Sequence, residues 1–297
     1  MKSWTLTIGQ FFATLHETFA RSSFEVRFLE GGSHMGKEII VATYNVLADG
    51  YICSDYYPGC DPNDYVAAVR HPRLLERVAN LDADVICLQE VEGTMFDLLK
   101  ARLKELGYVG FWARKRSGVK VKLDGCATFV RAPWRCVDSV TLHYDDGAHG
   151  RPRSGNVALI TDVEDQDGHT LTIANTHLKW FASNTPPEQN FGLTQASSLL
   201  AVVGSQAAER IICGDFNAEW GSDIIHAFAA AGYTDAHDAA VATFNLEKRA
   251  RKIDYLMHSS ALIARPFRTT SITDSTPLPS DTELSDHIPL RAAFTAR

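Results

Sequence analysis

No run of about 18 apolar residues occurs in the sequence, so no segment is predicted to cross a membrane as a helix. No Gly-x-x-x-x-Gly-Lys motif is present, which argues against nucleoside triphosphate binding by a phosphate loop. Low-complexity tracts, internal repeats and an evident signal peptide are also lacking. We therefore expect a cytoplasmic, monomeric, globular protein that does not engage membranes.

Cysteine pairs at metal-site spacing are missing as well. The six cysteines include no Cys-x-x-Cys pair, which argues against a thiolate zinc site. Cys87 and Cys213 lie in apolar, strand-like runs, where a thiol behaves as a small hydrophobic group. Only Cys53 and Cys60, in a polar loop, leave a disulfide or metal role open. We expect the cysteines to be reduced and structural.

Length and composition indicate a single catalytic domain. With 297 residues, of which 45% are hydrophobic and 22% charged, the chain can bury a full core. Gly-Ser-His-Met at 32–35 is typical of a cloning scar, so residues 1–36 are interpreted as a tag or fused segment and residues 37–297 as the domain. The formal net charge of −7 argues against nucleic-acid binding through bulk electrostatics. Any polyanionic substrate therefore requires a local basic patch.

Short apolar segments that lead into chemically versatile side chains recur along the chain. Residues 210–213 run into Gly214-Asp215-Phe216-Asn217, where a carboxylate and a carboxamide two positions apart would share one side of an extended strand. Taken alone, this motif is a turn after a core strand, because Asp and Asn are common turn residues. Five further segments of the same kind adjoin Asn45, Glu90, His177, Asp254 and Asp286 with His287. Coincidence explains one or two such segments but not six.

Apolar periodicity divides other segments into helices and strands. The spacing predicts helices over 72–81, with Pro72 near the start, and over 94–106, 193–203 and 223–231. Continuous apolar runs predict buried strands over 125–130 and 156–161. The alternation predicts helices that cover the faces of a sheet.

The polar side chains at the segment ends suit phosphoester chemistry at a hard metal ion. Carboxylates and carboxamides are ligands for Mg²⁺ or Mn²⁺ rather than zinc. Imidazoles can donate to a phosphate oxygen while an activated water attacks phosphorus. Turn capping, or a buried core position, is the alternative for each group, and Asn175 is the weakest candidate. The full set is Asn45, Glu90, Asn175, His177, Asp215, Asn217, Asp254, Asp286 and His287.

Six of these motifs occur in an order that resembles the endonuclease/exonuclease/phosphatase superfamily, over residues 38–297. The segments 124–129, 156–159 and 177–180 further resemble the branch that contains the cytoplasmic deadenylases, nocturnin, the Angel proteins and the 2′,5′-oligoadenylate phosphodiesterase. The six motifs are Tyr44-Asn45-Val46-Leu47-Ala48-Asp49, Leu88-Gln89-Glu90-Val91, Asn175-Thr176-His177-Leu178, Gly214-Asp215-Phe216-Asn217, Ile253-Asp254-Tyr255 and Ser285-Asp286-His287.

The resemblance implies an α+β fold of the deoxyribonuclease-I type. In this four-layer sandwich, two mixed β-sheets pack face to face, helices cover their outer faces, and strand ends from both sheets meet in a cleft. The resemblance also implies that Glu90 binds Mg²⁺, for which Mn²⁺ could substitute. Asn45 and Asp286 would be water-mediated or second ligands of the ion.

The same resemblance implies catalytic roles for the remaining residues. Asp215 would orient and deprotonate the attacking water, and Asn217 would steady it. His287, held by Asp254, and His177 would donate to the phosphate oxygens. A carboxylate behind an imidazole fixes its tautomer and favours its charged form, which supports the pairing of Asp254 with His287. The number of metal ions, and the choice of Asp215 or the His287 pair as the base, stay open.

Two basic clusters are candidates for contacts with the substrate. Arg114, Lys115, Arg116, Lys120 and Lys122 precede the strand at 125–130, and a second cluster at 248–252 leads directly into the site. We favour the second cluster because it adjoins the site, although a solvated charged loop is the alternative for any single member. An exposed tryptophan could stack on a base, and core packing is an equally common role. The substrate-binding candidates are Arg116, Trp180, Lys248, Arg249 and Arg251.

These features favour a Mg²⁺-dependent phosphodiesterase, a deadenylase-like 3′-5′ exoribonuclease acting on RNA. One alternative is a phosphatase or cyclic phosphodiesterase that acts on a small nucleotide or on a 2′,3′-cyclic phosphate end of RNA. Another is a catalytically silent RNA-binding module, which would not require four carboxylates beside a polyanion. Deadenylases usually continue after the motif at 214–217 with a small residue and a proline, whereas this chain continues with Ala218-Glu219-Trp220. Adenine preference therefore stays open.

Overall fold

The computed structural model describes residues 37–52, 56–57, 61–116, 123–147, 153–182, 185–186, 189–204 and 208–297. The residues from Met35 onward form one compact unit. The predicted tag or fused segment at 1–36 lies outside the described residues, as do Cys53, Cys60, Lys120 and Lys122. No helix in the described ranges combines the length and apolar character needed to span a membrane.

The first of two six-stranded sheets has the strand order β13-β14-β1-β2-β4-β3. Its one parallel pair is formed by β1 and β2, and all other neighbours are antiparallel. The strands are β1 (Ile39–Asn45), β2 (Val85–Gln89), β3 (Tyr108–Arg114), β4 (Gly125–Arg131), β13 (Leu262–Pro266) and β14 (Leu290–Ala296).

The second sheet repeats this plan with the order β5-β6-β7-β8-β12-β9. Its one parallel pair is formed by β7 and β8. The strands are β5 (Arg135–His143), β6 (Val157–Glu164), β7 (Thr170–His177), β8 (Arg210–Asp215), β9 (Thr234–Asp235) and β12 (Asp254–His258). A separate hairpin of β10 (Phe244–Leu246) and β11 (Arg249–Arg251) and two 3₁₀ turns, η1 (Asp49–Tyr51) and η2 (Pro62–Tyr65), complete the described elements.

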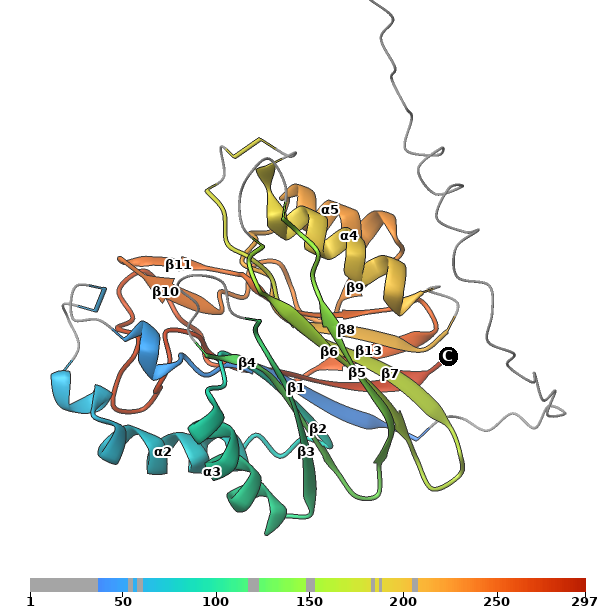
Figure 1. Ribbon diagram of the computed structural model, residues 1–297, viewed down its shortest axis with the longest axis horizontal. Coiled ribbons are helices and arrows are strands. Elements are labelled where there is room, and N and C mark those ends of the chain that lie inside the picture. The colour runs from blue at the N-terminus through green and yellow to red at the C-terminus, as the bar shows by residue number, and fades with distance from the viewer. Residues whose placement is uncertain are drawn as a thin grey trace, which may run out of the picture. The chain divides into compact units, whose positions relative to one another are not determined.

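The core lies between the two sheets and under the helices. Because side chains alternate along a strand, Val41 and Cys87 pack between the sheets with Ile211 and Cys213, whereas Ile86 faces outward. The outward face of the first sheet is covered by α2 (Ala67–Ala79) and α3 (Gly93–Lys104), and that of the second by α4 (Phe191–Val203) and α5 (Asp223–Ala230) (Figure 1). The predicted four-layer sandwich of two mixed sheets is confirmed.

The predicted helices and strands are present with shifted ends. The helix predicted over 72–81 begins five residues earlier, at Ala67, so Pro72 lies inside α2 and not near its start. Proline there removes only one backbone donor, and the burial of Leu74 and Val78 holds the helix against the sheet. The strand predicted over 156–161 extends to Glu164. In the described ranges Cys87, Cys126, Cys136 and Cys213 are free thiols.

The ends of the two parallel pairs define one rim of the sandwich. Asn45 is level with Gln89 in the first sheet, and His177 is level with Asp215 in the second. Asn175 ties the two sheets together at this rim, because its amide donates to the carbonyl oxygens of Leu88, at 3.1 Å, and Ala127, at 2.9 Å. Asn175 therefore has a scaffold role, in agreement with its place as the weakest of the functional candidates.

Gly214 allows β7 and β8 to approach each other beside the rim. Its φ is +135°, and a Cβ at this position would lie 1.9 Å from the carbonyl oxygen of Thr176. Only glycine tolerates both conditions. Gly214 is therefore required for the backbone path that places the Asp215 carboxylate at the rim.

Candidate active site

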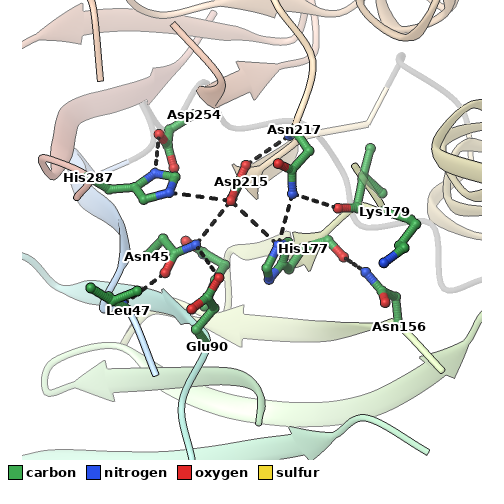
Figure 2. A network of polar contacts seen from close by, with 12 residues as sticks. Asn45, Leu47, Glu90, Asn156, His177, Lys179, Asp215, Asn217, Asp254 and His287 are labelled. Carbon is green, nitrogen blue, oxygen red and sulfur yellow. Dashed lines mark hydrogen bonds and ion pairs between the residues drawn. The ribbon is translucent and has the colours of Figure 1, made fainter. Parts of the chain in front are cut away.

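The carboxylate of Asp215, at the end of β8, is the centre of the polar network (Figure 2). One of its oxygens, Oδ2, accepts a hydrogen bond from Asn45 Nδ2 at 3.0 Å. The same oxygen lies 3.5 Å from His177 Nε2 and 3.7 Å from His287 Nε2. Residues from β1, β7, β8 and the segment before β14 thus converge on one buried atom.

The chain turns sharply after Asp215. The expected extended conformation does not continue, because Asn217 has a φ of +50° and its backbone N–H donates to Asp215 Oδ1 at 2.8 Å. The turn interpretation of this motif is therefore correct for Oδ1, while Oδ2 faces the network. The Asn217 amide donates to Leu178 O at 2.9 Å and lies 3.0 Å from His177 Nε2. Asn217 therefore closes the turn with its backbone and contacts the site with its side chain.

Glu90 follows β2 in a left-handed conformation, with a φ of +59°. Its Oε1 accepts from Asn45 Nδ2 at 3.1 Å, and its Oε2 accepts from the Ala48 backbone N–H at 3.0 Å. The Leu47 N–H donates to Asn45 Oδ1 at 3.0 Å, which fixes the orientation of this amide. Burial raises the pKa of Glu90, and the charge of Asp286 acts in the same direction. Glu90 is thus a half-buried acid with a second acid nearby.

His287 forms a buried pair with Asp254, the first residue of β12. Its Nδ1–H donates to Asp254 Oδ2 at 2.8 Å. Burial opposes the charged imidazole, but the carboxylates of Asp254 and Asp215 outweigh it and raise the pKa of His287 to about 10. His287 is therefore charged at neutral pH, and its Nε2–H is directed to Asp215.

Burial raises the pKa of Asp215 to about 7, against the opposing charge of His287. Burial lowers the pKa of His177 well below its ordinary value, and the charges of Lys115 and His287 lower it further. The Asn217 amide donates to His177 Nε2, so a neutral His177 carries its proton on Nδ1 in this geometry. The expected donation from His177 Nε2 to a phosphate would require Nε2 to leave Asn217 and to carry a proton.

Asp286 lies on the same side of the site as Glu90 and His287. The hydroxyl of Tyr57 donates to its Oδ2 at 2.9 Å, and its Oδ1 lies 4.0 Å from His287 Nε2. The contact between Asp286 and Tyr57 was not anticipated from the sequence. No motif marks this tyrosine, which precedes Asp286 by 229 residues.

The donors at this site are suited to a divalent cation. One group that could hold an ion comprises Glu90, His177 and Asp215, and a second comprises Asp215, Asp254 and His287. Within each group the nearest ligand atoms lie within 4.8 Å of one another. A positive ion stabilises neighbouring carboxylates whose charges repel one another. These residues therefore fit a bound divalent cation. Among the described residues, Asp286 belongs to neither group, and its ligand role stays a prediction.

Lys115 was expected in an exposed basic loop, and the structure places it inside. Its side chain is only 7% exposed, and its ammonium group bonds to the fully buried Asp124 at 2.6 Å. Burial opposes the charge of Lys115, but Asp124 outweighs it and raises its pKa. Lys115 also affects the pKa values of Glu90 and His177, which places it beside the site. The feature of the sequence that could have indicated the ion pair of Lys115 is Asp124, the acid at the start of the 124–129 motif.

The favoured basic cluster at 248–252 is largely neutralised. Arg249 forms an ion pair with Glu219 at 2.8 Å, and Arg251 lies 3.9 Å from the same carboxylate. Lys252 is buried against Asp235 at 2.5 Å and does not face a substrate. Lys248 is exposed at the turn of the hairpin.

The other substrate candidates lie on exposed surface. Trp180 is 58% exposed, so its ring is not part of the core and is free to contact a base. Arg116 is exposed and follows the end of β3. The hairpin lies next to the site, because Phe244 packs on the His287 ring with centroids 4.7 Å apart.

The chain matches a known family over most of its length. The sequence model of the Endonuclease/Exonuclease/phosphatase family aligns with residues 42–287. The chain belongs to this family. The nucleases and phosphatases of the Endonuclease/Exonuclease/phosphatase family break phosphoester bonds, so the chain is a hydrolase of that class, as the sequence predicted.

Individual members of the Endonuclease/Exonuclease/phosphatase family agree with the expected branch. Carbon catabolite repressor protein 4 homolog 1 of Arabidopsis thaliana is 30% identical over 214 residues, which cover 60% of this chain and 35% of that protein. The CCR4-Not complex 3′-5′-exoribonuclease subunit Ccr4 of Yarrowia lipolytica is 27% identical over 251 residues, which cover 67% of this chain and 35% of that protein. The chain thus spans about a third of the length of these curated relatives.

A solved structure supports the fold of this family member. The crystal structure of ANGEL2, a 2′,3′-cyclic phosphatase, in complex with adenosine-2′,3′-vanadate superposes with a TM-score of 0.71 at 20% identity. The superposition covers 88% of this chain and 96% of that chain. The predicted resemblance to the deadenylase, nocturnin and Angel branch is confirmed.

Proposed function

We propose that the chain is a Mg²⁺-dependent phosphodiesterase that shortens RNA from its 3′ end. The observation that carries this proposal is the position of Asn45, His177 and His287 around one oxygen of Asp215, at 3.0, 3.5 and 3.7 Å. A buried carboxylate between two imidazoles can direct a water at a phosphorus atom and stabilise the charge that develops. The Ccr4 relative, a 3′-5′-exoribonuclease subunit by name, supports RNA as the substrate.

In this proposal Glu90 holds the cation, with Asn45 and Asp286 close by. When bound, Mg²⁺ or Mn²⁺ in its place supplies Lewis-acid stabilisation of the phosphate charge. The fit rests on the half-buried Glu90, whose pKa is raised by desolvation and by Asp286. The Asn45 amide holds both Glu90 and Asp215 by hydrogen bonds, so it fixes the spacing between the cation side and the base side of the site.

Asp215 acts as the general base. It accepts the proton of the water as the new P–O bond forms and the bond from phosphorus to the 3′ oxygen of the preceding nucleotide breaks. A base is most effective when its pKa lies near the working pH, and burial raises the pKa of Asp215 to about 7. The N–H of Asn217 occupies Oδ1, which leaves Oδ2 to face the water.

His287 donates to a non-bridging phosphate oxygen. Asp254 holds its Nδ1 and keeps the ring charged, so Nε2–H is oriented before the substrate arrives. His177 contributes a second donor only when Nε2 leaves the Asn217 amide and takes up a proton. The main electrostatic stabilisation is therefore assigned to His287.

The test is a time course on 5′-labelled RNA oligonucleotides, one ending in adenosines and one of mixed sequence, with Mg²⁺ and with EDTA. We expect a Mg²⁺-dependent ladder that shortens from the 3′ end and is absent with Asp215→Asn. The ratio of the two rates measures adenine preference. If the RNA stays intact while nucleotides release phosphate or 2′,3′-cyclic ends are opened, the exonuclease proposal is wrong. The phosphatase or cyclic phosphodiesterase alternative would then replace it.

A further inference from the structure

A groove lies where the end of β3, at the edge of the first sheet, meets the end of β5, at the edge of the second. It has a volume of about 440 Å³ and is open to solvent. Trp112 forms a rigid wall, because its Nε1–H donates to Val91 O at 3.1 Å and its ring stacks on Phe96. The polar and aromatic lining consists of Trp112, Arg114, Lys115, Arg116, Thr141 and His143.

The groove carries positive charge that no ion pair within the described residues neutralises. Arg114 and Arg116 are exposed, and no carboxylate in the described part of the chain forms an ion pair with either of them. The hairpin arginines differ, because Arg249 and Arg251 share Glu219. Two arginines without a partner on a chain of net charge −7 indicate a local site for an anion.

Two short chains of contacts link the lining of the groove to the active site. Lys115, in its floor, bonds to Asp124 at 2.6 Å and lies close enough to Glu90 and His177 to affect their pKa values. The backbone N–H of Arg116 donates to Gly155 O at 3.0 Å. The next residue, Asn156, donates to the carbonyl oxygen of His177 at 2.8 Å (Figure 2). The groove therefore lies beside the His177 side of the active site.

We infer that this groove binds the backbone phosphates of single-stranded RNA on the 5′ side of the scissile bond, through Arg114 and Arg116. The inference rests on the proposed function and narrows its substrate to a polynucleotide, because a mononucleotide in the site would not reach the groove. Arginine pairs with phosphate through its planar fork of donors. The fixed face of Trp112 offers an apolar surface beside the strand.

The test is a binding measurement that does not depend on catalysis. Fluorescence anisotropy is recorded for labelled 2′-O-methyl RNA, a dinucleotide and an octanucleotide, in EDTA. The double variant Arg114→Ala/Arg116→Ala should bind the octanucleotide roughly tenfold more weakly and the dinucleotide unchanged. The slope of log affinity against log salt should fall by about 1.4 for the octanucleotide.

Two control variants test whether the loss of affinity is specific to this groove and to its positive charge. Arg135→Ala removes an exposed arginine at the opposite end of β5, paired with Glu164, and should leave both affinities unchanged. Arg114→Lys/Arg116→Lys keeps the charge and should recover most of the octanucleotide affinity. The inference is overturned if wild type binds neither oligonucleotide, if the double variant binds the octanucleotide as wild type does, or if both oligonucleotides lose affinity equally.

Hydrolysis assays separate this inference from the proposed function. If the octanucleotide binds through the arginines and unmodified RNA is not cleaved, the exonuclease proposal fails and the groove stands. If the double variant cleaves long RNA with the kcat/KM of wild type, the groove fails and the exonuclease proposal stands.

Discussion

The two halves of the site come from the same architecture and have opposite chemical character. Each sheet contains one parallel pair, and each pair ends at the shared rim. The first sheet ends in Asn45 and leads into Glu90, whereas the second ends in His177 and Asp215. Backbone geometry therefore brings the groups together, and the proposed function assigns cation binding to the first half and proton transfer to the second.

The largest effect is expected on the second-sheet half. Asp215→Asn keeps the shape of the side chain and removes the base, so kcat should fall by about 10³-fold. Raising the Mg²⁺ concentration should not restore it, because the lost group acts on the proton. Initial rates on 5′-labelled RNA across a Mg²⁺ series measure this. Recovery of kcat at high Mg²⁺ would show that Asp215 serves the cation instead.

Glu90→Gln is the matched change on the first-sheet half. It removes a charge from the proposed cation site, so the Mg²⁺ concentration for half-maximal activity should rise by roughly tenfold to hundredfold. Saturating Mg²⁺ should return part of kcat. A variant with the Mg²⁺ response of wild type would contradict the assignment of this half.

Asp254→Asn tests the pair that prepares His287. Without the carboxylate behind Nδ1, the imidazole is less strongly held in its charged form, and kcat should fall by about 10²-fold with little change in KM. Activity should also fall off at lower pH than in wild type, since the pKa of His287 drops. A pH profile with an unchanged basic limb would separate Asp254 from this role.

The pH dependence of stability is the smallest effect and also belongs to the second-sheet half. The pKa of His287 is raised in the folded protein to about 10, so its charged form stabilises the fold fully below about pH 6.5, and this contribution is lost as the pH rises through about 10. His287 contributes a slope of at most about 1.4 kcal/mol per pH unit in this window. Urea unfolding in EDTA should give a steeper decline with pH for wild type than for His287→Gln. Equal slopes would contradict the raised pKa.

The family resemblance of the six motifs implied the sandwich, and the apolar segments that end in polar side chains predicted the set of residues at its rim. The sequence did not predict which basic residues are accessible to a substrate. Lys115 and Lys252 are each adjacent to an arginine in the chain, and both are buried against a carboxylate, Asp124 or Asp235. A partner brought in by folding leaves no periodic signal, so such burial could be known only from the structure.

The backbone conformation at the ends of the motifs could not be predicted from the sequence either. Asn217 and Glu90 adopt positive φ, which non-glycine residues rarely do, and both owe it to contacts within the rim. The extended continuation after Asp215 was the simplest expectation, and the hydrogen bond from the Asn217 N–H to Oδ1 replaces it. Local propensity gives way where the site requires a turn.

The most direct test of the division between the halves is isothermal titration calorimetry of Mn²⁺ into wild type, Glu90→Gln and Asp215→Asn. The account predicts that Asp215→Asn binds the ion with an affinity close to that of wild type, while Glu90→Gln binds it at least tenfold more weakly. Equal losses in both variants, or a greater loss in Asp215→Asn, would contradict the assignment of cation binding to the first sheet and proton transfer to the second.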